Sequence, residues 1–182
     1  MPLEIEQKFR VENLEAVRGA LAGIGAQPLG VQSQSDQYFA HPGRDFRQTG
    51  EALRIRSTDK AACITYKGPK LDQVVKTRPE IELPLGESGA EFAELLAKLG
   101  FKPVAVVQKQ RERFAVTSGK YPLEVALDSV DWVGQFVEIE AIAQEPSVNL
   151  AKAEVVKLAK KLGLTNLEPR SYLRMLLESK DS

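Results

Sequence analysis

The stretch Glu4-Ile5-Glu6-Gln7-Lys8 places a charged side chain at every second position of the chain. Side chains two positions apart lie on the same face of a β-strand. If this stretch is a strand, its three charged side chains share one face and Ile5 lies on the other. The stretch therefore predicts a strand with one charged face and one apolar face.

The same alternation recurs along the chain. The polar and charged positions that alternate with apolar residues include Arg54, Arg56, Thr65, Lys67, Arg78, Glu80, Glu82, Glu124, Asp128, Glu138 and Glu140. The tripeptide Glu-Ile-Glu occurs at 4–6, 80–82 and 138–140. An ordinary sheet with one face in water also alternates, but neighbouring carboxylates repel each other unless a cation lies nearby. The repeated pairs therefore indicate a charged partner.

Turn residues and hydrophobic periodicity divide the chain into strands and helices. Strands are predicted at about residues 3–10, 34–40, 51–58, 61–68, 76–84, 104–117, 121–129 and 133–142, and helices at about 14–24, 88–99 and 149–162 and after Pro169. Ser88 and Glu91 are expected to form a capping box at the second helix, and 41–50 is expected to be a loop. This mixture predicts an α+β fold.

If the strands close into a barrel, their charged faces can point inward and the helices can cover the apolar exterior. In that arrangement Ile5, Ile55, Ile81 and Ile139 must face the covering helices. Carboxylates are ligands for Mg²⁺ or Mn²⁺, whereas Lys and Arg hold phosphate oxygens. The two kinds of charge together predict a metal-bound polyphosphate as the ligand.

Composition limits the remaining classes of protein. The chain has 182 residues, which is the size of one compact domain, and its 25 basic residues balance 25 acidic ones. This balance does not indicate a broad basic surface for nucleic acid. Cys63 is the single cysteine, no apolar stretch reaches the ~20 residues of a membrane span, and the charged start does not resemble a secretory signal. We expect one domain over residues 1–182, in the cytoplasm, that binds neither nucleic acid nor membrane.

At these residues the sequence resembles the CYTH superfamily, the triphosphate tunnel metalloenzymes, and most closely its class IV adenylate cyclase (CyaB-like) branch. The hallmark is E-x-E-x-K at residues 4–8. The other matching motifs are D-Q-Y-F at 36–39, R-D-F at 44–46, E-A-L-R-I-R at 51–56, T-Y-K-G-P at 65–69, K-T-R-P-E-I-E at 76–82, K-Q-R at 109–111, L-D-S-V at 127–130, G-Q-F-V-E-I-E at 134–140 and R-S-Y at 170–172. The ordered set spans nearly the whole chain.

The resemblance implies a closed eight-stranded antiparallel β-barrel, the triphosphate tunnel, with a charged lumen and flanking α-helices. It implies that Lys8, Arg54, Arg56, Lys67, Arg78, Lys109 and Arg111 bind the triphosphate and that Glu4, Glu6, Glu138, Glu140 and Asp128 hold Mg²⁺ or Mn²⁺. Among the basic residues, Lys8, Lys67, Lys109 and Arg111 are expected to take part in catalysis. The partner is then ATP or another triphosphate, and a homodimer is left open.

Three functions fit this resemblance. A class IV adenylate cyclase makes the ribose 3′ oxygen of ATP attack the α-phosphorus and expels pyrophosphate. A triphosphatase places water against the terminal phosphoryl group of thiamine triphosphate or inorganic triphosphate. A binding module would hold nucleotide or polyphosphate without turnover. The motifs favour the cyclase, and the carboxylates disfavour simple anion binding.

Single residues outside the main set carry weaker expectations. Arg113 continues the alternation of its strand and is either solvated or ligand-bound. Tyr172 either packs or closes the tunnel mouth, and the resemblance favours the second interpretation. His41 is expected at the surface, and Trp132 is expected to pack at a strand end. Phe114 stands where the family pattern suggests a tyrosine hydroxyl.

Overall fold

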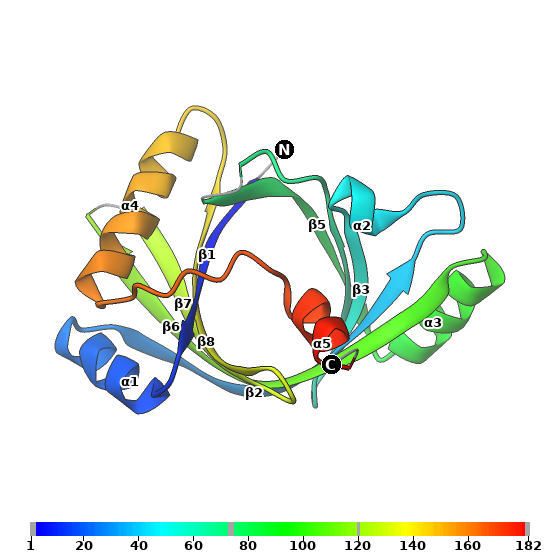
Figure 1. Cartoon of the computed structure of the whole chain (residues 1–182), viewed down its shortest axis with the longest axis horizontal. Helices are drawn as coiled ribbons and strands as arrows, with labels where there is room; N and C mark the ends of the chain where they lie inside the picture. Colours follow the sequence, from blue (N-terminus) through cyan, green and yellow to red (C-terminus); the bar gives the residue numbers. More distant parts are fainter. Residues whose placement is uncertain (1–2, 73–74, 120, 181–182) are drawn as a thin grey trace.

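Eight antiparallel strands form a ring in the computed structural model, which describes residues 3–72, 75–119 and 121–180. The strands are β1 Leu3–Val11, β2 Gln27–Ala40, β3 Ala52–Ser57, β4 Ala62–Lys67, β5 Lys76–Gly86, β6 Lys102–Ser118, β7 Tyr121–Val130 and β8 Gly134–Ala143. Their order around the ring is β1-β5-β4-β3-β2-β6-β7-β8, and β8 pairs back to β1 (Figure 1). The predicted α+β fold with an eight-stranded antiparallel sheet is confirmed.

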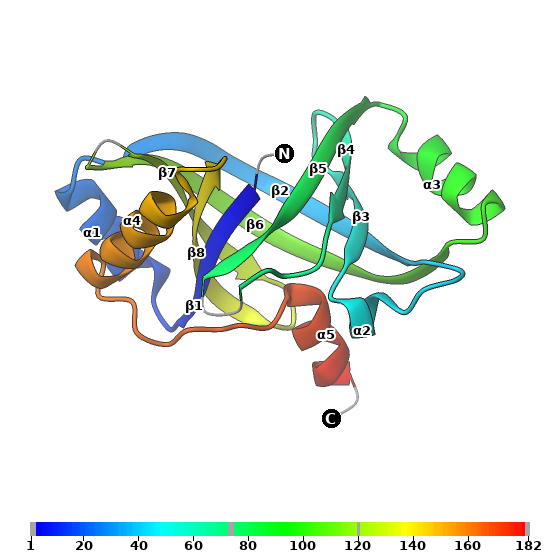
Figure 2. The ribbon, with the colours of Figure 1, turned by 90° about the horizontal axis from the view of Figure 1, so that it is seen from above.

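Helices cover the outside of the ring at two places. The helices are α1 Leu14–Gly23, α2 Phe46–Thr49, α3 Gly89–Lys98, α4 Val148–Lys161 and α5 Tyr172–Lys180. Helices α1 and α4 lie at one end of the long molecule and α3 lies at the other (Figure 2). None of the helices in the described ranges has the length and apolar character that crossing a membrane requires.

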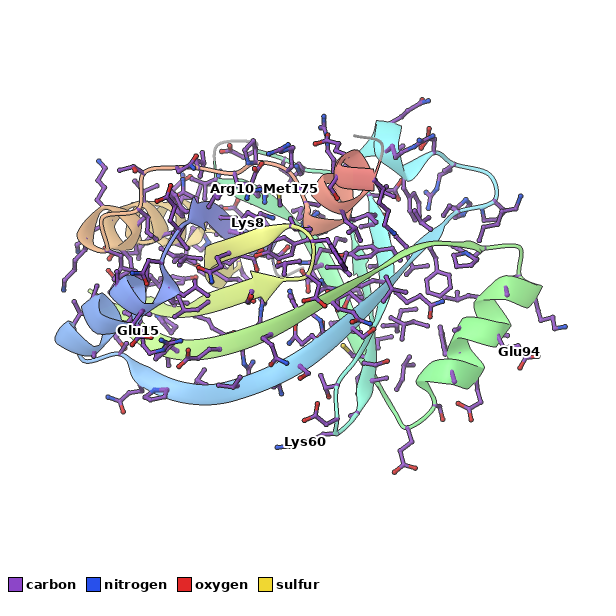
Figure 3. All side chains as sticks on the ribbon, turned by 60° about the horizontal axis from the view of Figure 1, so that its bottom comes forward. Lys8, Arg10, Glu15, Lys60, Glu94 and Met175 are labelled. Carbon is purple, nitrogen blue, oxygen red and sulfur yellow. The ribbon has the colours of Figure 1, made fainter. Side chains whose placement is uncertain are left out.

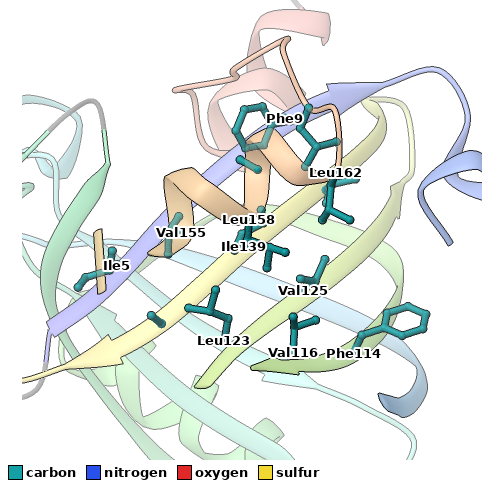
Figure 4. Close-up of a cluster of buried hydrophobic side chains, with 14 of the residues drawn as sticks. Ile5, Phe9, Phe114, Val116, Leu123, Val125, Ile139, Val155, Leu158 and Leu162 are labelled. Atoms are coloured by element: carbon teal, nitrogen blue, oxygen red, sulfur yellow. The ribbon is translucent and has the colours of Figure 1, made fainter. Parts of the chain in front are cut away.

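Three of the four isoleucines that are predicted to face covering helices pack under them. Ile5 and Ile139 are fully buried beneath Val155 and Leu158 of α4 (Figure 4). Ile55 is buried in a second cluster with Leu96 of α3. These side chains exclude water from the outer faces of the strands, so the charged faces point into the ring.

Ile81 is the exception, because 45% of its surface is exposed. The prediction that it faces a covering helix is wrong. Helix α3 covers only the end of β5, where Leu85 packs in its cluster, so Ile81 and the 56% exposed Leu83 lie outside the covered area. Alternation predicts which residues lie on the same face of a strand. It does not predict whether a helix covers that face.

Helix α5 differs from the others because it packs against the inner face of the ring. The cluster that it joins comprises Tyr38, Val107, Val130, Phe136, Tyr172, Met175 and Leu176. Phe136 is two residues from Glu138 and Tyr38 is two residues from Asp36, so both point inward with those charges. Figure 1 shows α5 within the outline of the ring, and Figure 3 shows Met175 beside Arg10 of β1. Helix α5 therefore fills one end of the interior.

The boundaries of two predicted segments differ from the structure. Strand β2 begins at Gln27, earlier than predicted, because its polar first half gains a ladder of pairs with the long strand β6. Within the predicted loop 41–50, Asp45 accepts a hydrogen bond from the Arg47 amide and caps the short helix α2. Both differences arise from hydrogen-bonding partners that the hydrophobic periodicity of the segment does not reveal.

Two predictions about single side chains are also wrong. Ser88 forms no side-chain cap, because its backbone (φ −85°, ψ 25°) is not the extended form from which the hydroxyl can reach the first helical amides. Trp132 does not pack: it lies in the turn between β7 and β8 with φ 64° and is 88% exposed. The tight turn directs the indole outward.

Candidate active site

The interior of the ring is lined by charged side chains of both signs. The basic residues are Lys8, Arg54, Arg56, Lys67, Lys76, Arg78, Lys109 and Arg111, and the acidic residues are Glu4, Glu6, Asp36, Glu80, Asp128, Glu138 and Glu140. Lys8, Asp36 and Asp128 are each at most 2% exposed. Burying an isolated charge to this extent is unfavourable. Pairs of opposite charge therefore dominate the electrostatics of the interior.

One group of charges surrounds Asp36 on β2. Arg56 donates to both carboxylate oxygens of Asp36 at 2.7 Å, and Arg54 donates at 3.1 Å. Lys109 Nζ lies 4.0 Å from Asp36 and 3.7 Å from Asp128. Burial would raise the pKa of Asp36, but Arg54 and Arg56 hold it well below its usual range. Asp36 therefore stays ionised and orients the two guanidinium groups.

A second group joins β6, β7 and β8 to helix α5. Arg111 Nε donates to Asp128 at 2.7 Å, and the same guanidinium pairs with Glu138. The Tyr172 hydroxyl donates to Asp128 at 2.7 Å, and Lys8 Nζ lies 4.0 Å from the centre of the tyrosine ring. Tyr172 thus packs in the buried cluster of α5 and also contacts the charged interior directly.

A third group joins β1, β4 and β5. Lys67 pairs with Glu4 and lies 2.6 Å from Glu80, while Arg78 Nε donates to Glu4 at 3.0 Å. Burial would raise the pKa of Glu4, but Lys67 and Arg78 lower it overall. Two cations are thereby held side by side through one carboxylate.

Glu140 is the acidic residue of the interior that lacks a cation of its own. Glu6 lies opposite it in the β1–β8 register but pairs with Lys76 at 2.7 Å. Glu140 itself forms no hydrogen bond or ion pair within the described ranges. Burial, together with the charge of Glu4, raises the pKa of Glu140 to about 8. An uncompensated carboxylate of this kind is suited to a bound cation.

Two interior lysines have lowered proton affinities. Burial, together with the neighbouring Lys76, lowers the pKa of Lys8 to about 8. Burial and the nearby Arg111 lower the pKa of Lys109 to about 7. Both ammonium groups therefore favour an added anion, because an anion would compensate the charge repulsion that they experience.

The CYTH domain family matches residues 2–172 of the chain. The chain belongs to the CYTH family. It is 35% identical, over 95% of this chain and 98% of the relative, to a Methanocaldococcus jannaschii protein named "putative adenylate cyclase". A solved structure from Pyrococcus horikoshii is 37% identical, covers 96% of this chain and 98% of its own, and superposes with a TM-score of 0.86. A protein from Hippeastrum, reported as a "putative adenylyl cyclase" with a dominant triphosphatase activity, shares the fold at 18% identity, 98% and 96% coverage and a TM-score of 0.69.

In this CYTH protein the ring brings every predicted site residue to one inner surface, which also holds residues that sequence reasoning missed. Lys76 is two positions before Arg78, so the same alternation could have revealed it. Asp36 lies inside the D-Q-Y-F motif, but it received no role because its partners, Arg54 and Arg56, lie on another strand.

The structure also shows where the residues with weaker expectations lie in this CYTH protein. Arg113 lies 3.6 Å from Glu124, with about a third of each side chain exposed. Phe114 is 5% exposed in the outer core, so a hydroxyl at this position would not point inward. His41 packs beside Phe46 outside the interior. Phe114 and His41 are not part of the charged inner surface, whereas Arg113 lies at its exposed edge.

The predicted metal ligands do not form a ready-made cluster. No three carboxylate, imidazole or thiol groups in the described part of this CYTH chain are arranged to enclose an ion. Asp128 and Glu138 are both paired with Arg111, whereas Glu140 forms no ion pair with any residue that the structure describes. The donor chemistry therefore fits a divalent cation best beside Glu140 and its register neighbour Glu6.

Proposed function

We propose that this protein is a class IV adenylate cyclase, which converts ATP to cyclic AMP and pyrophosphate with Mg²⁺ or Mn²⁺. The proposal treats residues 1–182 as one domain and the interior of the ring as its triphosphate tunnel. The observation that carries it is the continuous inner surface of paired, buried cations and carboxylates. CYTH proteins bind triphosphate substrates and generally depend on a divalent metal. The cyclase name of the Methanocaldococcus jannaschii relative supports this choice of reaction.

The triphosphate would replace the carboxylates as the partner of the interior cations. The proposed phosphate-binding residues are Lys8, Arg54, Arg56, Lys67, Arg78, Lys109 and Arg111. Each is already buried or nearly so and is held in position by acidic neighbours. Preorganised cations stabilise transferred phosphoryl charge without having to reorganise during the reaction. This arrangement explains why the interior contains both signs of charge.

The metal would take up the carboxylates that this exchange releases. Of the proposed ligands Glu4, Glu6, Glu138, Glu140 and Asp128, the best placed is Glu140, because it forms no ion pair in the described part of the chain and Lys67 acts on it only through its more distant charge. When bound, a divalent cation draws electron density from phosphate oxygens and lowers the pKa of a nearby hydroxyl. Triphosphate and metal are therefore expected to bind cooperatively, since each compensates the charges that the other displaces.

In the cyclisation, the ribose 3′ hydroxyl gives up its proton to solvent and its oxygen forms a bond to the α-phosphorus. The bond from that phosphorus to the bridging oxygen breaks, and pyrophosphate leaves with the electron pair. The chain's role is to hold the triphosphate in line and to stabilise charge on the leaving group. We assign this stabilisation to Lys8, Lys67, Lys109 and Arg111.

Hydrolysis is the second candidate reaction. The same cations would serve if water, rather than the 3′ hydroxyl, attacked the terminal phosphoryl group of thiamine triphosphate or inorganic triphosphate. The Hippeastrum protein that shares this fold has a dominant triphosphatase activity. A module that binds without turnover remains the third candidate, and it leaves the uncompensated Glu140 unexplained.

A product assay distinguishes these functions. Purified protein is incubated with Mg²⁺ or Mn²⁺ and, separately, ATP, thiamine triphosphate or tripolyphosphate, and cyclic AMP, pyrophosphate and orthophosphate are resolved. Cyclic AMP with pyrophosphate supports the proposal, orthophosphate without cyclic AMP selects the hydrolase, and binding without product selects the module. Arg56→Ala should abolish the activity and Arg56→Lys should restore only part of it, because an ammonium cannot replace the guanidinium fork. Arg47→Ala is the matched control, because Arg47 on α2 has an 88% exposed side chain.

A further inference from the structure

The interior is open at the end opposite to α5. Along the inner face of β6, Val107 packs in the α5 cluster, Lys109 and Arg111 follow at 4% and 6% exposure, and Arg113 has 35% of its side chain exposed. Exposure thus rises along the strand with distance from the helix. A group attached to a bound triphosphate must therefore extend toward Arg113, because α5 fills the other end.

Gln34 lies on the open side of Arg54 and Arg56, two of the phosphate-binding cations. On the inner face of β2, Tyr38 belongs to the α5 cluster, Asp36 holds the two arginines, and Gln34 comes next. In the β2–β6 register Gln34 is directly opposite Lys109, which places the two side chains next to each other. Gln34 therefore lies level with Lys109, on the open side of Arg54 and Arg56 and one step before Arg111.

The amide of Gln34 is buried but incompletely hydrogen-bonded. Only 6% of the residue is exposed, and Nε2 donates to Gln32 Oε1 at 3.3 Å. Oε1 has no hydrogen-bond partner within the described ranges. Leaving a buried acceptor unpaired is unfavourable, and such groups call for an explanation such as a ligand contact.

An amide oxygen accepts hydrogen bonds and cannot donate them. The ionised oxygens of a triphosphate also only accept, so they do not match Gln34 Oε1. A hydroxyl or amino group on the organic part of the ligand does match it. A nucleoside triphosphate has such a donor next to its phosphates, whereas inorganic triphosphate lacks one.

We propose that Gln34 is a specificity-determining residue that accepts a hydrogen bond from the organic group of the substrate and so favours an organic triphosphate over inorganic triphosphate. This inference rests on the proposed function, because it requires a triphosphate in the interior. It deepens that function by assigning the class of substrate to one side chain.

The test measures binding by calorimetry in Mg²⁺, using the non-hydrolysable bismethylene analogues of ATP and of tripolyphosphate so that turnover does not interfere. Gln34→Leu should weaken binding of the ATP analogue about three- to tenfold, the value of one neutral hydrogen bond, and leave the tripolyphosphate analogue unchanged. Gln108→Leu is the control, because Gln108 is exposed on the outer face of the strand that carries Lys109. Gln34→Asn, which keeps the amide but shortens its reach, should show the same selective loss and serves if the leucine variant does not fold.

Equal weakening of both analogues, or of neither, would overturn the assignment of Gln34 while leaving the proposed function intact. Wild-type protein that binds the tripolyphosphate analogue but not the ATP analogue would also overturn the assignment and would favour the hydrolase. Wild-type protein that binds neither analogue would overturn the proposed function and the assignment with it.

Discussion

Replacing Glu140 by Gln should stabilise the metal-free protein at alkaline pH. Glu140 has no hydrogen bond or ion pair to lose among the described residues, and its usual pKa of 4.5 is raised to about 8, first by burial and then by Glu4. A raised carboxyl pKa means that the folded state binds the proton more tightly than the unfolded state, so the associated stability is present below about pH 4.5 and is lost as the pH rises to about 8. Each tenfold difference in proton affinity is worth about 1.4 kcal/mol, which makes the loss roughly 3–5 kcal/mol above pH 8.

The measurement is urea unfolding of both proteins in EDTA at pH 5, 7 and 9, followed by circular dichroism. The free energies of unfolding should differ little at pH 5, and Glu140→Gln should become the more stable protein at pH 9. Added Mg²⁺ should stabilise the wild type more than the variant. Glu124→Gln is the control, because Glu124 is opposite Glu140 in the β7–β8 register but is a third exposed and paired with Arg113. Parallel stability profiles for wild type and Glu140→Gln would refute the reasoning.

Three further outcomes test the inverted arrangement of the ring. Ile139→Asp should unfold the protein, since it buries a charge at a fully buried position at a cost of several kcal/mol, whereas Ile81→Asp should be tolerated in thermal melts because Ile81 is 45% exposed; equal damage from both would contradict the described exterior. Cys63, the single cysteine, shares the inner face of β4 with Lys67, so tripolyphosphate with Mg²⁺ should slow its reaction with a maleimide, and an unchanged rate would place the ligand elsewhere. Tyr172→Phe removes a 2.7 Å hydrogen bond to a carboxylate and should lower the free energy of unfolding by about 1.5–3 kcal/mol; unaltered urea melts would show that the bond contributes nothing.

The charged interior could be predicted because it depends on alternation, which is a local property of the sequence. Arg54 and Arg56 must share a face in any strand, and Ile55 between them must point the other way. The helices over Ile5 and Ile139 could then be inferred, because an apolar exterior must be covered. The limit of this reasoning is Ile81, whose local pattern is the same but which lies outside the part of its strand that α3 covers.

The pairing of charges and the position of α5 could not be predicted in this way. The partners of Asp36 come from β3 and β6, and their distances depend on the register between strands. The sequence of α5 predicts an amphipathic helix, but the inner-face partners of Met175 and Leu176 are scattered over four strands. Tyr172 was assigned to the tunnel mouth only through a family resemblance, because nothing local distinguishes it from a packing aromatic.

Strand β1 pairs with both β5 and β8, and this position affects how the chain folds. Leu3 pairs with Ala143, so the first strand emerges from the ribosome long before its second neighbour exists. Contacts of such high contact order form slowly, because loop-closure entropy is lost before the contacts stabilise the chain. Until β8 is synthesised, Glu4, Glu6 and Lys8 remain hydrated and the sheet has open edges that can pair with other chains. We therefore expect ring closure to be both the slow step of folding and the step that protects this protein from aggregation.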